Sequence, residues 1–316
     1  MLTVSEVADF LRAHDNYLIL THKRPDGDTL GCAAGLCRML RARGKTAYLL
    51  RNAEVTGRYA PYVDALWAAD DYAQDTVVSV DLAALGLFPD NALAYRDRVD
   101  LAIDHHPSYE GFARLCCVDP ARAACGELLC ELAVELGALT PEVALPLYVA
   151  VATDTGCFVY SNVTADTHRA AAALMATGID VRPVNKALFR TKSKKRLALE
   201  ARLLGGMEFF DDGRIVVVQA PQSLIRELAL TENDMDDLAA LGGLVEGQDC
   251  SITMREQRDG AWKVSVRTGP RVNATRVCEK FGGGGHAAAS GCVLRGMSGE
   301  EAKRALVAAC IEAGHG

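Results

Sequence analysis

The chain has 316 residues, of which 50% are hydrophobic, and this length can bury one large core or two of medium size. Acidic residues outnumber basic ones by 41 to 34, and the net charge of −7 argues against a protein that coats long DNA or RNA by neutralising phosphates alone. No apolar run reaches the roughly 18 residues of a membrane span, and residues 1–16 do not resemble a signal peptide. The 11 cysteines contain no C-x-x-C pair, so we expect reduced, mostly buried thiols in a cytoplasmic protein without a membrane anchor.

Short apolar runs alternate with helical stretches from residue 16 to residue 104. We predict strands at residues 17–21, 46–50, 77–80 and 99–103, and a helix at residues 31–43. The runs are short and largely apolar, as buried parallel strands are. Helices are predicted at residues 125–136, 141–152 and 165–177, where apolar residues recur every three or four positions. The pattern predicts an α/β domain whose mostly parallel sheet is flanked by helices.

The character of the sequence changes after a charged segment at residues 182–206, which ends in a pair of glycines and which we interpret as a helical linker. Beyond it, hairpins are predicted at residues 207–219 and 251–266, with helices at 221–228, 232–241 and 299–313. We therefore predict a first domain at residues 1–181 and a smaller α+β domain at residues 207–316. The basic residues of the charged segment form either a solvated helix face or the wall of an anion-binding cleft; they are Arg182, Lys186, Arg190, Lys192, Lys194, Lys195, Arg196 and Arg202.

Acidic residues and histidines follow three of the predicted strands. They are His22, Asp26 and Asp28 after the first strand, Asp81 after the third, and Asp104, His105 and His106 after the fourth. Because the carboxyl ends of parallel strands meet at one edge of a sheet, we expect these side chains to converge on one crevice. A further acid, Asp154, ends an apolar helix, where the helix dipole disfavours a negative charge.

Each of these residues has an ordinary structural interpretation when it is taken alone. A single aspartate or histidine at a strand end is more often a capping or loop residue than a ligand, and Asp154 could be a solvent-facing helix terminus. Their joint occurrence favours a metal cluster, because several neighbouring carboxylates need cations in order to coexist. Carboxylates mixed with imidazoles suit Mn²⁺ or Mg²⁺ better than metals that prefer thiolates. The sequence therefore predicts a paired-metal site.

A glycine-rich motif occupies residues 281–291, and its four consecutive glycines are Gly282, Gly283, Gly284 and Gly285. Their amides can form a concave anion-binding nest, with His286 as an additional donor. The alternative is a flexible loop, which the helix-like segment before the glycines and the apolar segment after them make less attractive. Arg267 and Asn273 could contact a phosphate or a base, but they could also be a surface arginine and a helix N-cap, and the sequence favours the cap for Asn273.

Together these motifs resemble those of the DHH phosphoesterase superfamily, in the subfamily with a DHH-associated C-terminal domain of type one. The resemblance rests on His22-x-x-Pro25-Asp26-x-Asp28, Asp81, Asp104-His105-His106, Asp154 and the glycine-rich loop, in this order along nearly the whole chain. The compact length is similar to that of the bacterial oligoribonucleases and 3′-phosphoadenosine-5′-phosphate (pAp) phosphatases of the nanoRNase type. Two positions depart from the frequent pattern, Cys32 in place of serine and Ser290 in place of alanine or glycine, and neither removes a ligand.

The resemblance implies two Mn²⁺ ions, or other divalent ions such as Mg²⁺, held by His22, Asp26, Asp28, Asp81, His105 and Asp154. It also implies that Asp81 bridges the ions and that His106 contacts the substrate phosphate, so that both belong to the catalytic centre. The smaller domain would bind the nucleotide through Arg267, Asn273, the four glycines and His286, with the active site in the cleft between the domains. The expected reaction is attack on phosphorus by a water that the two metals activate.

The implied activity is that of a cytoplasmic, Mn-dependent exonuclease that hydrolyses short oligoribonucleotides to mononucleotides and pAp to AMP, and a homodimer is compatible with the resemblance. A cyclic di-AMP or pApA phosphodiesterase would share every metal ligand and is the nearest alternative. An inorganic pyrophosphatase of the same superfamily would lack the glycine-rich loop. A non-catalytic nucleotide-binding regulator would not need six intact ligands. The pyrophosphatase and the regulator are therefore weaker alternatives.

Overall fold

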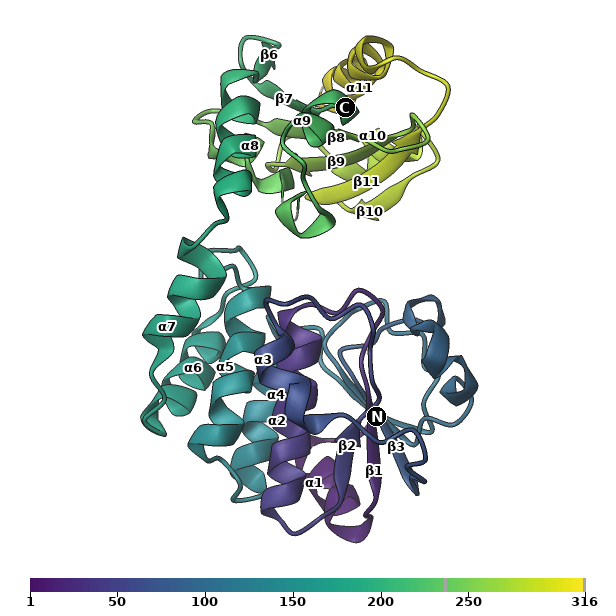
Figure 1. The fold of residues 1–316 in the computed structure, drawn as a ribbon, viewed down its shortest axis with the longest axis vertical. Coiled ribbons are helices and arrows are strands. Elements are labelled where there is room, and N and C mark those ends of the chain that lie inside the picture. Colours follow the sequence, from purple (N-terminus) through teal and green to yellow (C-terminus); the bar gives the residue numbers. More distant parts are fainter. Residues whose placement is uncertain (236–237, 315–316) are drawn as a thin grey trace. The chain divides into compact units, whose positions relative to one another are not determined.

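The computed structural model describes residues 1–235 and 238–314, and the chain forms two compact units (Figure 1). The first unit comprises Met1–Thr191 and the second comprises Lys192–Gly316. Their boundary falls inside the segment 182–206 that we interpreted as a linker, and the residues of that segment are divided between the two units. Across the part of the chain that is described, no helix is both long enough and apolar enough to cross a membrane.

A five-stranded parallel sheet forms the centre of the first unit, which confirms the predicted α/β class. Its strand order is β2 (Ala47–Leu49), β1 (Tyr17–Leu20), β3 (Thr76–Val80), β4 (Leu101–Asp104) and β5 (Leu115–Val118). In the register of the central strands, Leu18 of β1 lies opposite Tyr48 of β2 and Val77 of β3. The sequence analysis did not predict the edge strand β5, whose first two residues are only half-buried.

Helices cover one face of this sheet (Figure 1). They are α1 (Val4–Ala13), α2 (Gly27–Ala42), α4 (Cys125–Glu135), α5 (Pro141–Asp154) and α6 (Ala165–Ala176), which share one buried cluster with Tyr17 and Ile19 of β1. Because side chains alternate along a strand, Leu18 and Leu20 of β1 point to the other face. There they join a second, smaller cluster with Phe88, beside the short 3-10 helices η2 (Leu85–Leu87) and η3 (Asp90–Tyr95).

Helix α2 begins at residue 27 rather than at the predicted residue 31, because Asp26 caps it by accepting two backbone N–H groups of the first turn. Glycines at every fourth position, Gly27, Gly31 and Gly35, let α2 lie very close to α5. A Cβ atom at Gly31 would lie only 2.3 Å from the carbonyl oxygen of Pro146, so any side chain there would force the helices apart. This contact places the first turn of α2 beside the last turn of α5.

A six-stranded mixed sheet forms the second unit. Its order is β10 (Gly284–His286), β11 (Ala289–Leu294), β9 (Trp262–Thr268), β8 (Cys250–Glu256), β7 (Ile215–Ala220) and β6 (Glu208–Phe210), in which β7 and β8 are parallel and the other neighbours are antiparallel. Helices α8 (Lys194–Gly205) and α9 (Gln222–Glu227) share a buried cluster with Val216 and Val218 of β7. Helices α10 (Ala274–Glu279) and α11 (Gly299–Gly314) share another with Ile215 and Val217, so helices pack on both faces. Both predicted hairpins are present.

One predicted helix of the second unit is not formed as expected. In place of a single helix at residues 232–241, the chain makes two 3-10 turns, Glu232–Met235 and Leu238–Ala240. Residues 236–237 of the predicted helix lie outside the described residues.

The charged helix α8 packs against the second unit, where Leu199 and Leu203 are buried. Several basic residues of this segment are paired with acids: Lys192, which precedes α8, and Arg196 within it both contact Glu200, at 2.7 and 2.6 Å. Arg202 likewise pairs with Glu227, and the preceding Arg182 pairs with Asp180. These pairs favour the interpretation of this segment as a solvated helix face over that of a cationic wall.

Candidate metal centre

The six predicted metal ligands lie together at one edge of the parallel sheet. They follow β1 (His22), β3 (Asp81) and β4 (His105), or lie at the start of α2 (Asp26, Asp28) and at the last residue of α5 (Asp154). Their ligand atoms form two groups, His22 with Asp26 and Asp81, and Asp28 with His105 and Asp154, and a third group joins Asp81 and His105 to His106. Within each group the atoms lie within 4.8 Å of one another. The convergence of strand ends therefore brings all six side chains into one site.

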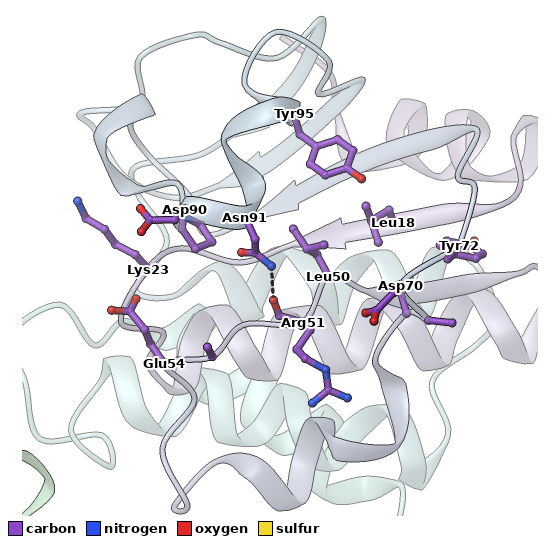
Figure 2. A pocket seen from close by; sticks show the side chains of 14 residues that line it. Leu18, Lys23, Leu50, Arg51, Glu54, Asp70, Tyr72, Asp90, Asn91 and Tyr95 are labelled. Atoms are coloured by element: carbon purple, nitrogen blue, oxygen red, sulfur yellow. Dashed lines mark hydrogen bonds between the residues drawn. The ribbon is translucent and has the colours of Figure 1, made fainter.

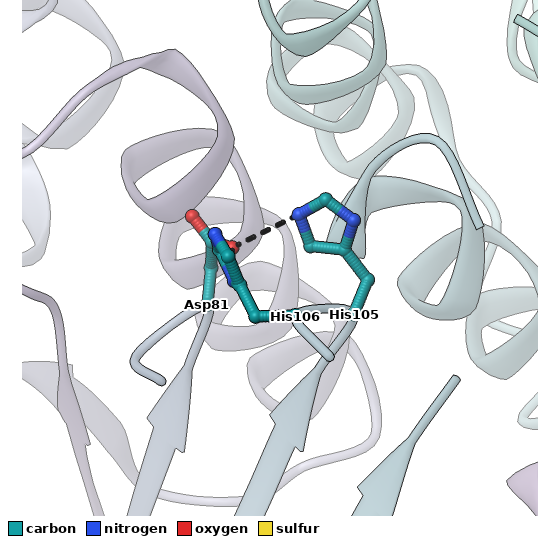
Figure 3. A group of neighbouring side chains, drawn as sticks. All are labelled: Asp81, His105 and His106. Carbon is teal, nitrogen blue, oxygen red and sulfur yellow. Dashed lines mark ion pairs between the residues drawn. The ribbon is translucent and has the colours of Figure 1, made fainter. Parts of the chain in front are cut away.

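Asp81 reaches both groups. One carboxylate oxygen, Oδ2, lies 3.8 Å from Nε2 of His22. The other, Oδ1, lies 3.5 Å from Nε2 of His105, as Figure 3 shows. The side chain is buried, and its Oδ1 has no hydrogen-bond partner. The backbone of Asp81 has a φ of 51°, a left-handed conformation that aspartate and asparagine tolerate better than most residues. A buried carboxylate oxygen without a donor is costly, and a shared cation is the partner that fits it.

Backbone carbonyls fix the orientation of two histidine rings. Nδ1 of His22 lies 2.8 Å from the carbonyl oxygen of Lys23, and Nδ1 of His105 lies 3.1 Å from that of Arg122. A carbonyl can only accept, so Nδ1 donates in each ring and Nε2 keeps the lone pair that a metal needs. Both Nε2 atoms face the carboxylates of the site.

Helix α4 supports Asp28, and the sequence analysis did not predict this contact. The two oxygens of Asp28 accept the backbone N–H groups of Cys125, at 2.7 Å, and Gly126, at 3.0 Å, at the start of α4. An anionic side chain is stabilised at a helix N-terminus, where N–H groups lack partners within the helix. The thiol of Cys32, the departure from the frequent serine, donates to the same carboxylate at 3.1 Å.

The segment 122–126 contacts Asp28 and His105 directly and is linked to the backbone of Asp154 through Asn162. Besides the bonds to Asp28 and His105, the side chain of Asn162 donates to the carbonyl oxygens of Ala123 and Asp154. Buried Glu127 holds this segment, because its Oε1 accepts the N–H of Ala123, at 3.3 Å, and the hydroxyl of Thr167, at 2.7 Å. No sequence motif pointed to Glu127, Thr167 or Asn162, since their contacts join residues up to 40 positions apart.

His106 has a different environment from His105. Asp104, the residue before the pair, is fully buried, and its Oδ1 accepts Nδ1 of His106 at 2.8 Å as well as the backbone N–H of both histidines. The side chain of His106 is 39% exposed, against 12% for His105. With Nδ1 committed to Asp104, Nε2 of His106 is the atom left for a ligand from solvent. The sequence analysis placed Asp104 in the motif but gave it no role.

The carboxylates of the site oppose one another in the metal-free chain. Burial, together with the neighbouring Asp28, raises the pKa of Asp81 well above its usual range and that of Asp154 to about 7. Burial also raises the pKa of Asp28, and Asp26 adds to this shift. Such groups ionise together when cations offset their charge. The donor set of carboxylates and imidazoles therefore fits divalent ions of the Mn²⁺ or Mg²⁺ type.

The glycine-rich motif of the second unit differs from the expected nest. The amides of Gly282 and Gly283 donate to the carbonyl oxygens of Glu279 and Cys278, closing the end of α10, so these two amides are not available to an anion. Gly284 and Gly285 lie in the edge strand β10. A nest of four open amides was therefore the wrong expectation for the first two glycines, because they terminate a helix.

Arg267 and His286 lie in one row across the second sheet. Arg267 of β9 pairs with Ala289 of β11, which pairs in turn with His286 of β10, so the two side chains share a face on either side of a small residue. Both are exposed. Asn273 caps α10, as the sequence favoured, by accepting the N–H groups of Thr275 and Arg276.

Comparisons with known proteins bear on this architecture. Residues 16–179 match the DHH family, N-terminal domain, and residues 224–313 match the DHHA1 domain. The bifunctional oligoribonuclease and PAP phosphatase NrnA of Thermus thermophilus is 33% identical over 97% of this chain and 93% of its own length. The protein of the same name from Bacillus subtilis is 25% identical over 96% of each chain.

Two further relatives differ in what they share with the chain. The cyclic-di-AMP phosphodiesterase GdpP of Geobacillus thermodenitrificans is 27% identical over 94% of this chain but over only 47% of its own length. The solved structure of an exopolyphosphatase-related protein from Bacteroides fragilis has a TM-score of 0.87 at 23% identity, covering 98% of this chain and 95% of that one. The latter likeness shows a shared fold.

The parallel sheet, the double ligand set and these matches define a hydrolase that acts on phosphate esters. The chain belongs to the DHH family, with a DHHA1 domain after its N-terminal domain, as the sequence motifs indicated.

Proposed function

We propose that this chain is a Mn²⁺-dependent exonuclease of the cytoplasm that hydrolyses short oligoribonucleotides to mononucleotides and pAp to AMP. The observation that carries the proposal is that Asp81 belongs to one ligand group and lies 3.5 Å from His105 of the other. The substrates are supported by the two relatives that are named oligoribonuclease and PAP phosphatase and that align over more than nine-tenths of their length. Eleven free cysteines fit a reducing compartment.

In this proposal, His22, Asp26 and Asp81 would hold one cation, and Asp28, His105 and Asp154 would hold the other, with Asp81 within reach of both groups. Two divalent cations supply an activated water near neutral pH and offset the charge that develops on the phosphoryl oxygens. The ligand set contains four aspartates, whose charge two divalent ions cancel, so the loaded site accepts an anionic substrate. The carbonyls of Lys23 and Arg122 and the amides of Cys125 and Gly126 keep the ligands in place.

His106 and the second unit provide the contacts to substrate. His106, held through Nδ1 by Asp104, donates from Nε2 to the phosphate that is cut when its ring is the doubly protonated imidazolium. Arg267 and His286 hold the phosphate and terminal nucleotide, assisted by the amides of Gly284 and Gly285. Asn273 acts indirectly, as the cap of α10. The placement of the active site between the two units stays a prediction.

Hydrolysis of cyclic di-AMP is the second candidate function, because that activity would use the same ligands. The chain spans less than half of the cyclic-di-AMP phosphodiesterase that it matches, whereas it spans nearly all of the oligoribonucleases. The oligoribonuclease and pAp phosphatase activities are therefore favoured.

Product analysis tests this proposal. Purified protein with Mn²⁺, with Mg²⁺ and with a chelator is incubated with pAp, pApA, cyclic di-AMP, RNA of two to five nucleotides and RNA of about 20 nucleotides. We expect turnover of pAp, pApA and the short RNA, strongest with Mn²⁺ and lost with the chelator. Preferential cleavage of cyclic di-AMP would reverse the order of the two candidates. The homodimer stays a prediction that light scattering of the same sample measures.

A further inference from the structure

A cavity lies in the first unit beside the loop that carries His22 (Figure 2). Its volume is about 520 Å³, which is within the range of small-molecule binding sites. It occupies the sheet face that carries Leu18, on the side of the 3-10 helix η3. The side chain of Asn91 in η3 donates to the carbonyl oxygen of Arg51 at 2.7 Å, so the walls of the cavity are tied together. Nothing described for the metal centre uses this space.

The two ends of the cavity differ in chemistry. Leu18, Tyr72 and Tyr95 line one end, where Asp70 lies beside Tyr72, and Tyr95 extends from η3 above Leu18 and Leu50 (Figure 2). Lys23 and Glu54 line the other end. A planar ring that packs against tyrosine and leucine at the first end would place polar substituents at the second.

The charged end adjoins the loop that positions a metal ligand. Lys23 follows His22 in the chain, and its carbonyl oxygen accepts Nδ1 of His22 at 2.8 Å. At the same end, the carboxylate of Glu54 accepts the N–H of Arg24 at 2.7 Å, and the side chain of Asn52 donates to the carbonyl of His22 at 3.0 Å. A molecule in the cavity would therefore lie next to the loop of the catalytic centre.

The charges that line the cavity restrict its ligand. Three carboxylates, those of Glu54, Asp70 and Asp90, line it together with two cations, Lys23 and Arg51. An excess of carboxylates disfavours a ligand with several phosphates, and carboxylate oxygens accept hydrogen bonds from hydroxyl and amino groups. A base with its ribose has such groups, and it has the flat apolar faces that the tyrosine end accommodates.

We propose that this cavity is a nucleoside-binding subsite, which receives the terminal nucleoside of a short oligoribonucleotide on the side of the cut bond that carries no further phosphate. The inference rests on the proposed function and extends it. Lys23, at the charged end, lies towards the phosphate that joins this nucleoside to the rest of the substrate. The dinucleotide pApA has a nucleoside for the cavity, whereas pAp has none, so the two substrates depend on it differently.

Two variants test the subsite in the full-length, Mn²⁺-loaded protein. Ala53→Trp fills the cavity from an exposed position, and Tyr95→Ala removes the aromatic wall. Base stacking on an aromatic side chain contributes appreciably to the free energy of binding. We therefore expect the ratio of kcat/KM for pApA to kcat/KM for pAp to fall about tenfold in each variant, mainly because KM for pApA rises. Leu93→Ala, an exposed residue of the same 3-10 helix that does not line the cavity, is the matched control and should keep the wild-type ratio.

Adenosine serves as a second probe, because it has the nucleoside that the cavity receives but no phosphate to be cut. It should inhibit the hydrolysis of pApA competitively in the wild type, and this inhibition should weaken in Ala53→Trp. The subsite can therefore still be tested if Tyr95→Ala does not fold. An unchanged ratio in both folded variants, or an equal loss on pApA and pAp, would overturn the subsite while leaving the proposed function intact. A wild-type protein that hydrolyses neither substrate would instead overturn the proposed function and, with it, this inference.

Discussion

Asp81 is the residue at which the two ligand groups meet, so its substitution tests the whole assignment. We expect Asp81→Asn to lose at least one cation and to lower kcat/KM by at least about a hundredfold, because the amide cannot bridge two cations. Asparagine tolerates the left-handed backbone at this position, so the fold should be preserved. Metal analysis after dialysis and a turnover assay measure both effects. Asp97→Asn, an exposed aspartate outside the site, is the control, and two retained ions with normal turnover in Asp81→Asn would refute the assignment.

The two adjacent histidines should separate metal binding from chemistry. His105 faces two aspartates of its group through Nε2, whereas His106 is more exposed and is held through Nδ1 by Asp104. We therefore expect His106→Ala to keep both cations but to lose turnover, and His105→Ala to lose a cation. Calorimetric titration with Mn²⁺ distinguishes the two variants. Loss of a cation in His106→Ala would mean that the two histidines have the opposite roles.

The raised pKa of Asp154, about 7, predicts how stability depends on pH. A carboxyl group whose pKa is raised by folding stabilises the fold below about pH 4, and this contribution is lost as the pH rises through about 7. As the pH rises from about 5 to about 8, the melting temperature of the metal-free wild type should therefore fall relative to that of Asp154→Asn. Saturating Mn²⁺ should reverse the order at the upper pH, because the cation binds the ionised form. A difference between the two proteins that stays constant with pH would contradict this prediction.

At the scale of elements, the strand ends were the predictable part of the site. Short apolar runs that each ended in an acid or a histidine indicated both the parallel sheet and the edge at which its ligands lie. The sequence did not indicate that the amides of α4 hold Asp28, because that contact joins residues nearly 100 positions apart. The sequence analysis also assigned the wrong role to the first two glycines of the glycine-rich motif. A glycine that terminates a helix and a glycine whose amide binds an anion look alike in a sequence.

The segment 122–126 is an element whose role can be tested through Glu127. Removing the carboxylate in Glu127→Ala frees the N–H of Ala123 and the hydroxyl of Thr167, and should loosen the segment that supports Asp28 and His105. We expect a loss of about 10- to 100-fold in the affinity for one of the two cations, as is typical of residues that orient metal ligands. Glu127→Gln keeps an acceptor oxygen and should restore most of the affinity. A uniform drop in melting temperature with unchanged metal affinity would make the role of Glu127 purely structural.

For the whole molecule, charge and composition point to small substrates. The net charge of −7 disfavours the binding of a long strand, and the pairing of Lys192, Arg196 and Arg202 with Glu200 and Glu227 offsets part of the positive charge of the segment 182–206. The first unit carries the metal ligands, and the second carries Arg267 and His286 on one sheet face. This arrangement favours a model in which the first unit catalyses hydrolysis and the second unit binds the nucleotide at the end of a short substrate.

Substitutions in the second unit test that division. Arg267→Ala and His286→Ala should each raise KM for pApA roughly tenfold or more, because a charge-assisted contact to phosphate is lost. The same variants should affect bis-p-nitrophenyl phosphate much less, since this phosphodiester has no nucleotide for the second unit to hold. Arg304→Ala, an exposed arginine of α11, should change neither substrate. An equal loss on both substrates would place Arg267 and His286 in the chemical step, and efficient digestion of RNA of about 20 nucleotides would contradict the preference for short substrates.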